Sequence, residues 1–512
     1  MMKTQIFVDR GGTFTDLVAL TPTGQILSHK LLSENPEQYE DAIVQGIRDL
    51  LQLSPGQAIP QDAIEVIKIG TTVGTNALLE RKGDRTVLVI TQGFKDALKI
   101  GYQNRPDIFA LNIVLPALLY ERVVEIEERV NAQGEVLRPV NEPQVQRDLQ
   151  AIYDLGIRSC AIVLLHSYAY PQHEQQVAVI AQKIGFTQIS ISHQISPLRK
   201  FIARGDTTVL DAYISPTLRR YVEQVSQQLN PTQQDPIKLL FMQSNGGLTT
   251  ANHFRGKDSL LSGPAGGMIG AVKTSLQAGF SKIITFDMGG TSTDVAHFQG
   301  DYERQFETEI AGVRISVPML AIHTVAAGGS SILQFKHQRF QVGPESAGAN
   351  PGPLSYRRGG PLCLTDANLL LGKIQVAYFP QVFGPAGNLP LDQATVQQAF
   401  KTLTVEIQSQ TGQPFTPNQV AAGFIAIAVE NMANAIKKIS IQRGYDVADY
   451  TLVCFGGAGG QHACLIAEKL GMKTIFLHPL AGVLSAYGMG LAEQRVIKQK
   501  HIEMPLDEAL IR

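Results

Sequence analysis

The stretch that decides the fold is FVDRGGTFTD, residues 7 to 16, in which an acid, two glycines, two threonines and a second acid follow an apolar run. The same order returns far downstream as TFDMGGTSTD, residues 285 to 294. Apolar, β-branched residues flank each glycine pair, which predicts a β-hairpin with a tight turn in both places. The interval between Asp9 and Asp287 far exceeds the period of a solenoid or propeller repeat. The sequence therefore predicts two large lobes that open with a similar element.

The composition is that of a multidomain protein without a bulk charge. The chain has 512 residues, of which 44% are hydrophobic and 17% charged, with 44 Lys and Arg against 45 Asp and Glu. A length above about 300 residues predicts at least two domains. The balanced charge gives no reason to expect nucleic acid or an anionic membrane as a partner. The four cysteines form no C-x-x-C pair, which favours a reducing, cytoplasmic location.

No export signal or membrane span is expected. The first residues, MMKTQIFVDRGG, reach an acid and a turn before a signal-peptide core could form. The longest apolar run in a helical context, VAAGFIAIAV at residues 420 to 429, stops at Glu430 and is expected to be too short to cross a bilayer. A helix is predicted over 419 to 442, with apolar residues at the spacing of a packed core.

Strand and helix patterns alternate between the hairpins. RTVLVIT (85 to 91) and SCAIVLLH (159 to 166) predict buried strands, and EDAIVQGIRDLLQ (40 to 52) and EQQVAVIAQKIG (174 to 185) predict helices. This alternation predicts an α/β fold with mixed sheets covered by helices. The character changes near SHQISPLRKFIARGD, so we expect a first lobe over 1–195 and a second over 196–512, with about ten residues of uncertainty. VGPESAGANPGPLSYRRGGP (342 to 361) is expected to be irregular, either an ordered loop over a site or a plain surface connection.

The two glycine turns can hold a phosphate. Glycine brings backbone N–H groups close to a ligand without an obstructing Cβ, and the threonine hydroxyls add donors. A bare carboxylate beside a phosphate would repel it, and Mg²⁺ held between them through water removes the conflict. The candidates for the metal shell, or for orienting a nucleophile, are Asp9, Asp16, Asp287 and Asp294. The alternative is a pair of ordinary hairpins with solvated acids.

A third glycine loop, VCFGGAGGQHACLIAEKLG (453 to 471), leads from a predicted strand into a helix that starts near Gln461. A helix N-terminus behind such a loop favours an anion or a closely packed nucleotide. It lacks the dinucleotide fingerprint, and no P-loop pattern occurs in the chain. His462, at the beginning of this helix, has two interpretations: it contacts a ligand, or it is a capping or core histidine. QSNGGL (243 to 248), SGPAGG (262 to 267) and VAAGGSS (325 to 331) either turn near a nucleotide or allow tight packing.

Two hairpins and a glycine loop before a helix, in this order, resemble the nucleotide clamp of the actin, sugar-kinase and Hsp70 superfamily. That resemblance implies a two-lobed, ribonuclease H-like ATPase fold that closes on ATP. Within it, the chain resembles the hydantoinase/oxoprolinase family, and the motifs cover nearly its whole length. They are DRGGTFTD, GTTVGTNALLERKG, QSNGG, SGPAGG, DMGGTSTD, VGPESAGANPGP, TDANLLLG and GGAGGQHA. IGYQNRPDIFAL and LYERVVEIEERV are most similar to the oxoprolinase branch.

The resemblance implies a reaction and its cofactors. It implies ATP-driven opening of 5-oxo-L-proline to L-glutamate, a step of glutathione metabolism, with the amide oxygen phosphorylated first. ATP and Mg²⁺ are the expected cofactors, and the expected partner is a hydantoinase B-like subunit or half, in an oligomer. A related cyclic substrate such as a hydantoin, and a non-catalytic nucleotide-binding remnant, are the alternatives. The lactam pocket has only Asn104, Arg105 and the 342 to 361 loop as candidates.

The resemblance also implies the roles of individual residues. Asp9 and Asp287 would bind the metal, and together with Asp16 and Asp294 they would form the catalytic set. The phosphates and adenosine would be held by residues of the three loops, which are Gly11, Gly12, Thr13, Thr15, Gly289, Gly290, Thr291, Thr293, Gly456, Gly457, Gly459 and Gly460.

Overall fold

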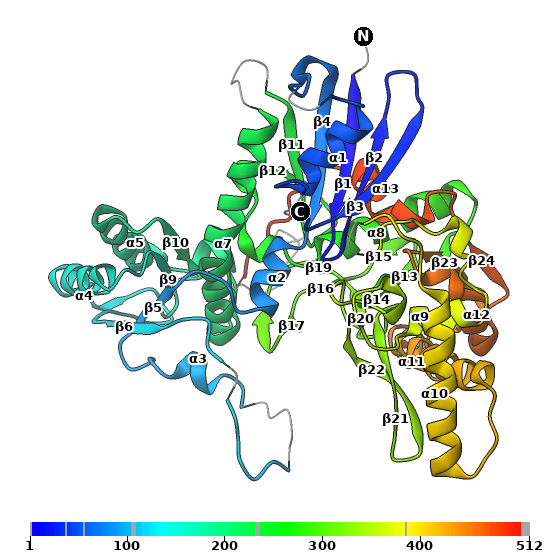
Figure 1. Ribbon diagram of the computed structural model, residues 1–512. Helices are drawn as coiled ribbons and strands as arrows, with labels where there is room; N and C mark the ends of the chain where they lie inside the picture. The colour runs from blue at the N-terminus through cyan, green and yellow to red at the C-terminus, as the bar shows by residue number, and fades with distance from the viewer. Residues whose placement is uncertain are drawn as a thin grey trace.

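The computed structural model describes residues 3–35, 38–54, 57–103, 109–115, 117–230, 236–384 and 387–502. Two large sheets and one small sheet, each covered by helices, form most of the described part of the chain, together with four two-stranded sheets (Figure 1). Each large sheet begins with one of the glycine hairpins. The predicted α/β class, two-lobed with mixed sheets covered by helices, is confirmed.

The first large sheet has the strand order β12-β11-β4-β1-β2-β3. Strand β1 (Thr4–Arg10) pairs antiparallel with β2 (Phe14–Leu20) and parallel with β4 (Ile64–Thr71), and β3 (Ile26–Leu32) extends the hairpin. Strands β11 (Lys238–Met242) and β12 (Leu248–Thr250) join from beyond residue 195. Helices α1 (Ala42–Leu50) and α7 (Phe201–Leu229) cover one face. The division of the chain at residue 195 stays a prediction.

The second large sheet repeats this beginning. Strand β13 (Lys282–Met288) pairs antiparallel with β14 (Thr293–Gln299) and parallel with β23 (Thr451–Phe455), which pairs with β24 (Thr474–Phe476). Strands β15 (Asp301–Tyr302) and β20 (Ile322–Val325) both pair with β14. The packing helices are α9 (Leu364–Leu370), α10 (Gln393–Thr411), α11 (Pro417–Ile439) and α12 (Ala463–Leu470).

Two small-residue helices lie between the large sheets and join them. Helix α8 (Ser262–Gln277) packs backbone to backbone against α13 (Leu484–Leu491), so that a Cβ on Gly488 would stand 2.0 Å from the carbonyl oxygen of Gly266. Their apolar side chains share one core with Phe7 of the first sheet and Val453 of the second. The SGPAGG motif is therefore needed for close packing at the centre of the molecule.

The small sheet is built from parallel strands in the order β10-β9-β5-β6. Strands β5 (Thr86–Thr91) and β9 (Ser159–Val163) and helices α1 and α5 (Gln172–Ile184) confirm the four elements predicted from periodicity. The remaining elements are α2 (Val73–Leu79), α3 (Ala97–Ile100), α4 (Glu142–Asp154), α6 (Ser192–Ile195), β6 (Arg122–Ile126), β7 (Arg129–Val130), β8 (Val136–Arg138), β10 (Gln188–Ile191), β16 (Arg304–Gln305), β17 (Thr308–Ile310), β18 (Val313–Ile315), β19 (Met319–Leu320), β21 (Ser331–Lys336) and β22 (Arg339–Ser346).

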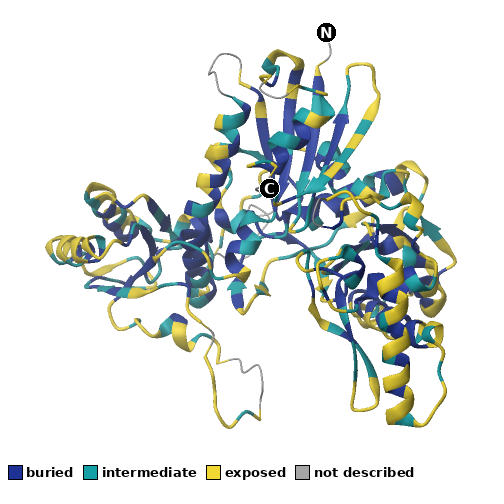
Figure 2. Ribbon diagram, viewed as in Figure 1, coloured by how far each residue is buried: buried dark blue, intermediate teal, exposed yellow. Residues whose placement is uncertain are grey.

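Two expectations need correction. Residues 342 to 346 are not irregular, because they belong to β22, which pairs with β21 and so gains backbone hydrogen bonds that composition does not reveal. The apolar run at 420 to 429 belongs to a longer segment, Pro417–Arg443, that is long and apolar enough to cross a membrane. In the structure most of its apolar residues lie in the core of the second lobe, while Ile427 and Ile441 are exposed (Figure 2). The predicted helix over 419 to 442 is confirmed to within three residues.

Candidate functional site

The two hairpins bring four carboxylates together. The strand register places Asp9 opposite Asp16 in the first hairpin and Asp287 opposite Asp294 in the second. The two pairs also interact between lobes. The charge of Asp294 raises the pKa of Asp9, as does that of Asp16 in the same hairpin, and the charge of Asp9 raises the pKa of Asp287. The structure thus assembles the acids that the sequence placed far apart.

Burial is the main cause of the shifted titration of these carboxylates. It raises the pKa of Asp9 to about 7 and that of Asp294 to about 6, and raises the pKa values of Asp16 and Asp287 as well. The Oδ1 atom of Asp9 is buried and accepts no hydrogen bond from the described residues. Such a cluster of like charges is unstable when fully ionised, and an added cation would stabilise it.

The donor atoms of the cluster fit Mg²⁺ held through water. Carboxylate oxygens are its preferred protein ligands, and this ion usually keeps several of its waters. Within the described ranges, no three acidic, histidine or cysteine side chains lie close enough to bind one ion directly. The buried, unpartnered oxygen of Asp9 is the clearest sign that a ligand completes the cluster.

Each hairpin turn is closed by the same backbone hydrogen bond. Gly11 N donates to Phe14 O at 3.0 Å, and Gly289 N donates to Ser292 O at 3.0 Å. Gly12 is exposed, and a Cβ there would meet nothing within 4 Å. The turns, which also hold Thr13, Gly290 and Thr291, therefore offer open backbone to a ligand.

The second threonine of each motif points into the protein. Thr15 is fully buried and its hydroxyl lies 3.0 Å from that of Ser33, while the buried Thr293 donates to Ala327 O at 2.5 Å. These hydroxyls brace the segments that support the turns. Whether either one also contacts a phosphate stays a prediction.

The third loop approaches the second hairpin through its first glycines. Gly456 has φ +82°, and a Cβ there would stand 2.4 Å from Oδ1 of Asp287, whereas Gly457 is exposed and open. Gly459 instead packs against Cys454, where its Cβ would stand 2.9 Å from Sγ, and Gly460 is exposed. The loop thus brings bare backbone beside Asp287, where only glycine fits.

His462 lies behind this loop rather than in it. The ring is fully buried, and its Nε2 accepts a hydrogen bond from Asn368 Nδ2 at 3.1 Å. Burial, with a smaller effect of Lys373, lowers the pKa of His462 to about 3, so the ring is neutral at physiological pH. The structure favours a core histidine at the beginning of α12, which starts at Ala463 after a short turn.

Helix α8 contributes two glycines of the SGPAGG motif, for which the sequence left open a turn near a nucleotide or tight packing. A Cβ on Gly263 would stand 3.0 Å from Oδ1 of Asp9, and one on Gly267 would stand 3.3 Å from Oδ2 of Asp287. The first turns of α8 therefore lie beside both acids. The SGPAGG motif was the available signal, but spacing could not show which carboxylates it would meet.

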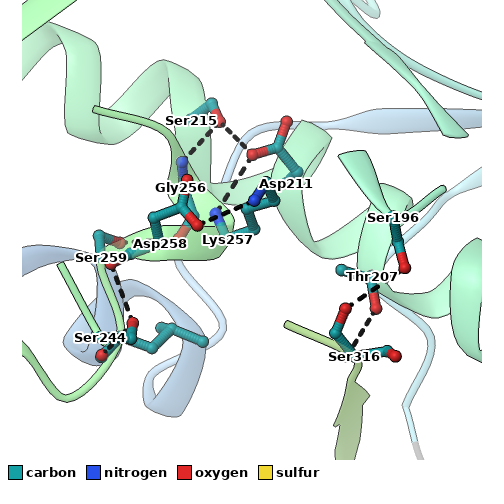
Figure 3. A network of polar contacts seen from close by, with 11 residues as sticks. Ser196, Thr207, Asp211, Ser215, Ser244, Gly256, Lys257, Asp258, Ser259 and Ser316 are labelled. Carbon is teal, nitrogen blue, oxygen red and sulfur yellow. Dashed lines mark hydrogen bonds and ion pairs between the residues drawn. The ribbon is translucent and has the colours of Figure 1, made fainter. Parts of the chain in front are cut away.

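Polar contacts from α7 fix the segment that leads into α8 (Figure 3). The backbone N–H groups of Gly256 and Lys257 donate to Ser215 Oγ at 3.0 Å and Asp211 Oδ1 at 3.2 Å. Ser244 Oγ donates to Leu260 O at 2.6 Å. These bonds hold the beginning of α8 against the first sheet, and so set its distance from Asp9.

Lys30 is another residue of the site that the sequence analysis did not identify. Its ammonium forms an ion pair with Asp16 Oδ1, and the strand register of β2 and β3 places the two residues opposite each other. Thr324 on β20 takes the equivalent place in the second lobe, where its hydroxyl donates to Asp294 at 2.5 Å. No local pattern marks either residue, because both come from strands that pair only after folding.

The candidates for the lactam pocket remain largely untested. Asn104 and Arg105 lie outside the described residues. The 342 to 361 segment backs the second turn, since Ala347 N donates to Ser330 O and Ser330 N donates to Gly290 O. This segment therefore supports the backbone of the second glycine turn through Ser330.

Comparison with known proteins agrees with this architecture. The model of the hydantoinase/oxoprolinase N-terminal region matches residues 5–185, and the hydantoinase/oxoprolinase model matches residues 204–498. The chain belongs to the hydantoinase/oxoprolinase family. A 5-oxoprolinase of Dictyostelium discoideum is 45% identical to this chain. The match covers 95% of this chain and 42% of the Dictyostelium discoideum protein. The caprolactamase subunit alpha of Pseudomonas jessenii is 31% identical over 98% of this chain and 72% of its own.

The fold is shared with a solved structure of similar sequence. The crystal structure of the ATP-dependent caprolactamase from Pseudomonas jessenii superposes with a TM-score of 0.79 at 30% identity, covering 95% of this chain and 70% of the other. The chain spans less than half the length of the 5-oxoprolinases that it matches, for example 42% of the Dictyostelium discoideum protein.

Proposed function

We propose that this oxoprolinase-family chain binds ATP and phosphorylates 5-oxo-L-proline, as the ATP-using half of an enzyme that opens this lactam to L-glutamate. The observation that carries the ATP part is the convergence of four partly buried carboxylates from two glycine hairpins. The choice of lactam is supported by the 45% identity to a 5-oxoprolinase over 95% of the chain.

The turns and the third loop would divide the nucleotide between them. Open backbone at Gly12 and in the second turn suits the phosphates, and the exposed Gly457, which follows the Gly456 that lies beside Asp287, suits the nucleoside end. Asp9 and Asp287 would hold Mg²⁺, which neutralises phosphate charge when bound. Asp16 and Asp294 would orient the hydrated ion, and the fixed geometry supplies positioning and charge compensation for phosphoryl transfer.

The reaction would proceed through an activated amide. The lactam oxygen attacks the γ-phosphorus and ADP leaves with the bonding electron pair. Water then adds to the activated ring carbon, and the ring C–N bond breaks as the nitrogen takes a proton, which leaves an acyl phosphate. A second water hydrolyses this acyl phosphate to the carboxylate of L-glutamate and free phosphate. ATP is spent in this way because an unactivated amide is a poor electrophile for water.

The proposal includes a second polypeptide or half and a cytoplasmic location. The 5-oxoprolinase relative is more than twice as long as this chain, and the caprolactamase relative is named as one subunit. A hydantoinase B-like partner would complete the hydrolytic step, within an oligomer. Glutathione metabolism is the pathway in which the reaction would serve.

The test is phosphate release from Mg-ATP by the purified chain, with and without 5-oxo-L-proline. Release that rises with 5-oxoproline, alone or after the adjacent gene product is added, is the expected result. ATP binding with no release under either condition would favour a non-catalytic remnant and contradict the proposal.

A related cyclic amide is the second candidate substrate, favoured by the 0.79 TM-score to caprolactamase. A panel of caprolactam, hydantoin and 5-oxoproline would separate the two. Stronger stimulation of ATP hydrolysis by caprolactam or hydantoin than by 5-oxoproline would replace the proposed substrate while leaving the ATP site in place.

A further inference from the structure

A small cavity lies beside the first hairpin turn, on the other face of the sheet from Asp9. Its volume is about 220 Å³, and it is lined by Arg10, Gly11, Gly12, Thr72, Asn76 and Lys82 among others. Successive residues of a strand point to opposite faces, so Arg10 faces α7 while Asp9 faces α8. The glycine turn is thus shared between the cavity and the carboxylate cluster.

The size of this cavity suits a small ring rather than a nucleotide. A volume of 220 Å³ equals about seven water molecules and falls below the roughly 300 to 1,000 Å³ of pockets for drug-sized ligands. Two larger hollows, of about 900 and 930 Å³, lie along α4 and α5 and between α5 and α7, and neither is lined by a residue of the two glycine hairpins.

Arg10 presents a fixed cation to the cavity. Its guanidinium carbon lies 4.9 Å from the centre of the Tyr221 ring, and its side chain is 17% exposed. The Asp41 carboxylate is 3.8 Å away, which is beyond hydrogen-bond distance. A guanidinium has five N–H donors in a rigid fork that matches a carboxylate. Arg10 is therefore oriented by its neighbours and has donors left for a ligand.

Asn76 adds the chemistry that an amide ring needs. Its Nδ2 donates to Thr72 Oγ1 at 3.5 Å, a contact at the limit of a hydrogen bond. A primary carboxamide has both a donor and an acceptor. A lactam presents its N–H and C=O on the same side of the ring, so the two groups can pair at two points.

The acidic residues in the cavity wall do not cancel the preference of Arg10 for an anionic ligand. Glu80 forms an ion pair of 2.7 Å with Lys82. Glu34 is exposed to solvent, where its charge is screened. On the buried side of the cavity the Asp41 carboxylate, 3.8 Å from Arg10, offsets part of the guanidinium charge. The unused N–H donors of Arg10 remain available there for an anionic ligand.

We propose that this cavity is the acceptor-substrate subsite and takes a small lactam that carries a carboxylate. Arg10 binds the carboxylate and Asn76 pairs with the ring amide. The open backbone at Gly12 is where the lactam oxygen meets the phosphate. This inference rests on the proposed function, since it names the residues that select 5-oxo-L-proline.

The test compares two ligands that differ by one group. Equilibrium binding of 5-oxo-L-proline and of 2-pyrrolidone, the same ring without the carboxylate, is measured on the wild-type chain and on Arg10→Gln, Arg10→Lys and Asn76→Leu. Arg85→Gln is the matched control, because Arg85 is 54% exposed and pairs with Glu121, and neither residue lines the cavity. ADP binding and thermal unfolding report whether each variant is folded.

The expected pattern is specific. Arg10→Gln weakens 5-oxoproline binding by about ten- to a hundredfold, as for loss of a charged hydrogen bond, and leaves 2-pyrrolidone within about twofold. Arg10→Lys, which keeps the charge but loses the fork, has an intermediate effect. Asn76→Leu weakens both ligands about equally, and Arg85→Gln weakens neither.

Three results would overturn the inference. They are wild-type binding of 5-oxoproline no tighter than that of 2-pyrrolidone, an Arg10→Gln variant that still prefers 5-oxoproline, and equal weakening of both ligands by Arg10→Gln. If ADP binding and lactam-stimulated ATP hydrolysis persist with any of these, the proposed function stands and only this subsite is wrong. If the ligand pattern holds without ATP hydrolysis, the proposed function fails instead.

Discussion

The two hairpins share a motif and a turn, yet their surroundings differ. In the first lobe, Asp16 pairs with the ammonium of Lys30, whose charge lowers the pKa of that carboxylate against the effect of burial. In the second, Asp294 receives a hydroxyl from Thr324, and its pKa is raised to about 6. The same ten-residue pattern therefore forms a charge-compensated hairpin in one lobe and an acidic one in the other.

This difference shows that negative charge is compensated unequally in the two lobes. The Lys30 charge also lowers the pKa of Asp9, whereas the charges that act on Asp287 come from Asp294, Asp9 and Asp16 and all raise its pKa. The second hairpin thus depends more on a bound cation than the first. Substitutions at matched positions can test how far the lobes are unequal.

The largest effect is expected from removing the central acids. Asp9→Ala and Asp287→Ala should each lower the rate of ATP hydrolysis by at least about a hundredfold, because each removes a charge that positions the metal and phosphates. Steady-state phosphate release measures the loss, and circular dichroism should show an intact fold. Asp301→Ala, an exposed acid on β15, is the control. Normal hydrolysis by both variants would reject the clamp.

Stability should change with pH in a way that separates Asp9 from Asp16. A carboxyl whose folded pKa is raised, here from 3.8 to about 7, binds more protons in the folded state, so its contribution to stability falls as pH rises from about 4 to about 7. Asp9→Asn should therefore stabilise the metal-free protein at pH 8 by a few kcal/mol at most, and much less at pH 5. Asp16→Asn should gain less, since it leaves Lys30 unpaired. Thermal unfolding at both pH values measures this, and equal gains for both variants would contradict it.

A matched glycine pair tests the backbone of the two turns. A Cβ on Gly11 would stand 2.9 Å from Phe14 O, whereas one on Gly289 would stand 3.9 Å from Ser292 O. Gly11→Ala should cost about 1 to 3 kcal/mol of unfolding free energy through overpacking, and Gly289→Ala about 0.5 kcal/mol or less. Urea denaturation measures both. An equal loss at the two positions would mean that the turns are equivalent.

The smallest effect should come from the partners of the outer acids. Lys30→Gln removes a cation that lowers the pKa of Asp16, so the acidic limb of the ATP hydrolysis profile should move to higher pH. Because the Lys30–Asp16 ion pair is partly exposed, we expect the rate of ATP hydrolysis on the acidic limb to fall by about two- to fivefold. Thr324→Val, which removes only a hydrogen bond to Asp294, should move the limb less. A larger shift for Thr324→Val would reverse the comparison between the lobes.

Local signals account for what could be predicted. Alternating apolar residues around Gly-Gly-Thr predicted both hairpins, and a buried β-branched run predicted β5, because these patterns act within a few residues. The loop before α12 was found for the same reason. Strand β22 was missed, because its hydrogen bonds come from pairing with β21 and not from its own glycine- and proline-rich composition.

The sequence by itself determined the elements that can hold a phosphate and the acids beside them, since glycine turns and strand periods are properties of short segments. Only the tertiary structure decided that Asp9 and Asp287 share one cluster, that Lys30 compensates one side of it, and that Thr15 faces inward. These outcomes depend on which distant strands pair and how deeply each carboxylate is buried. Burial and long-range charge arise only when the lobes pack around α8 and α13, and no spacing along the chain encodes them directly.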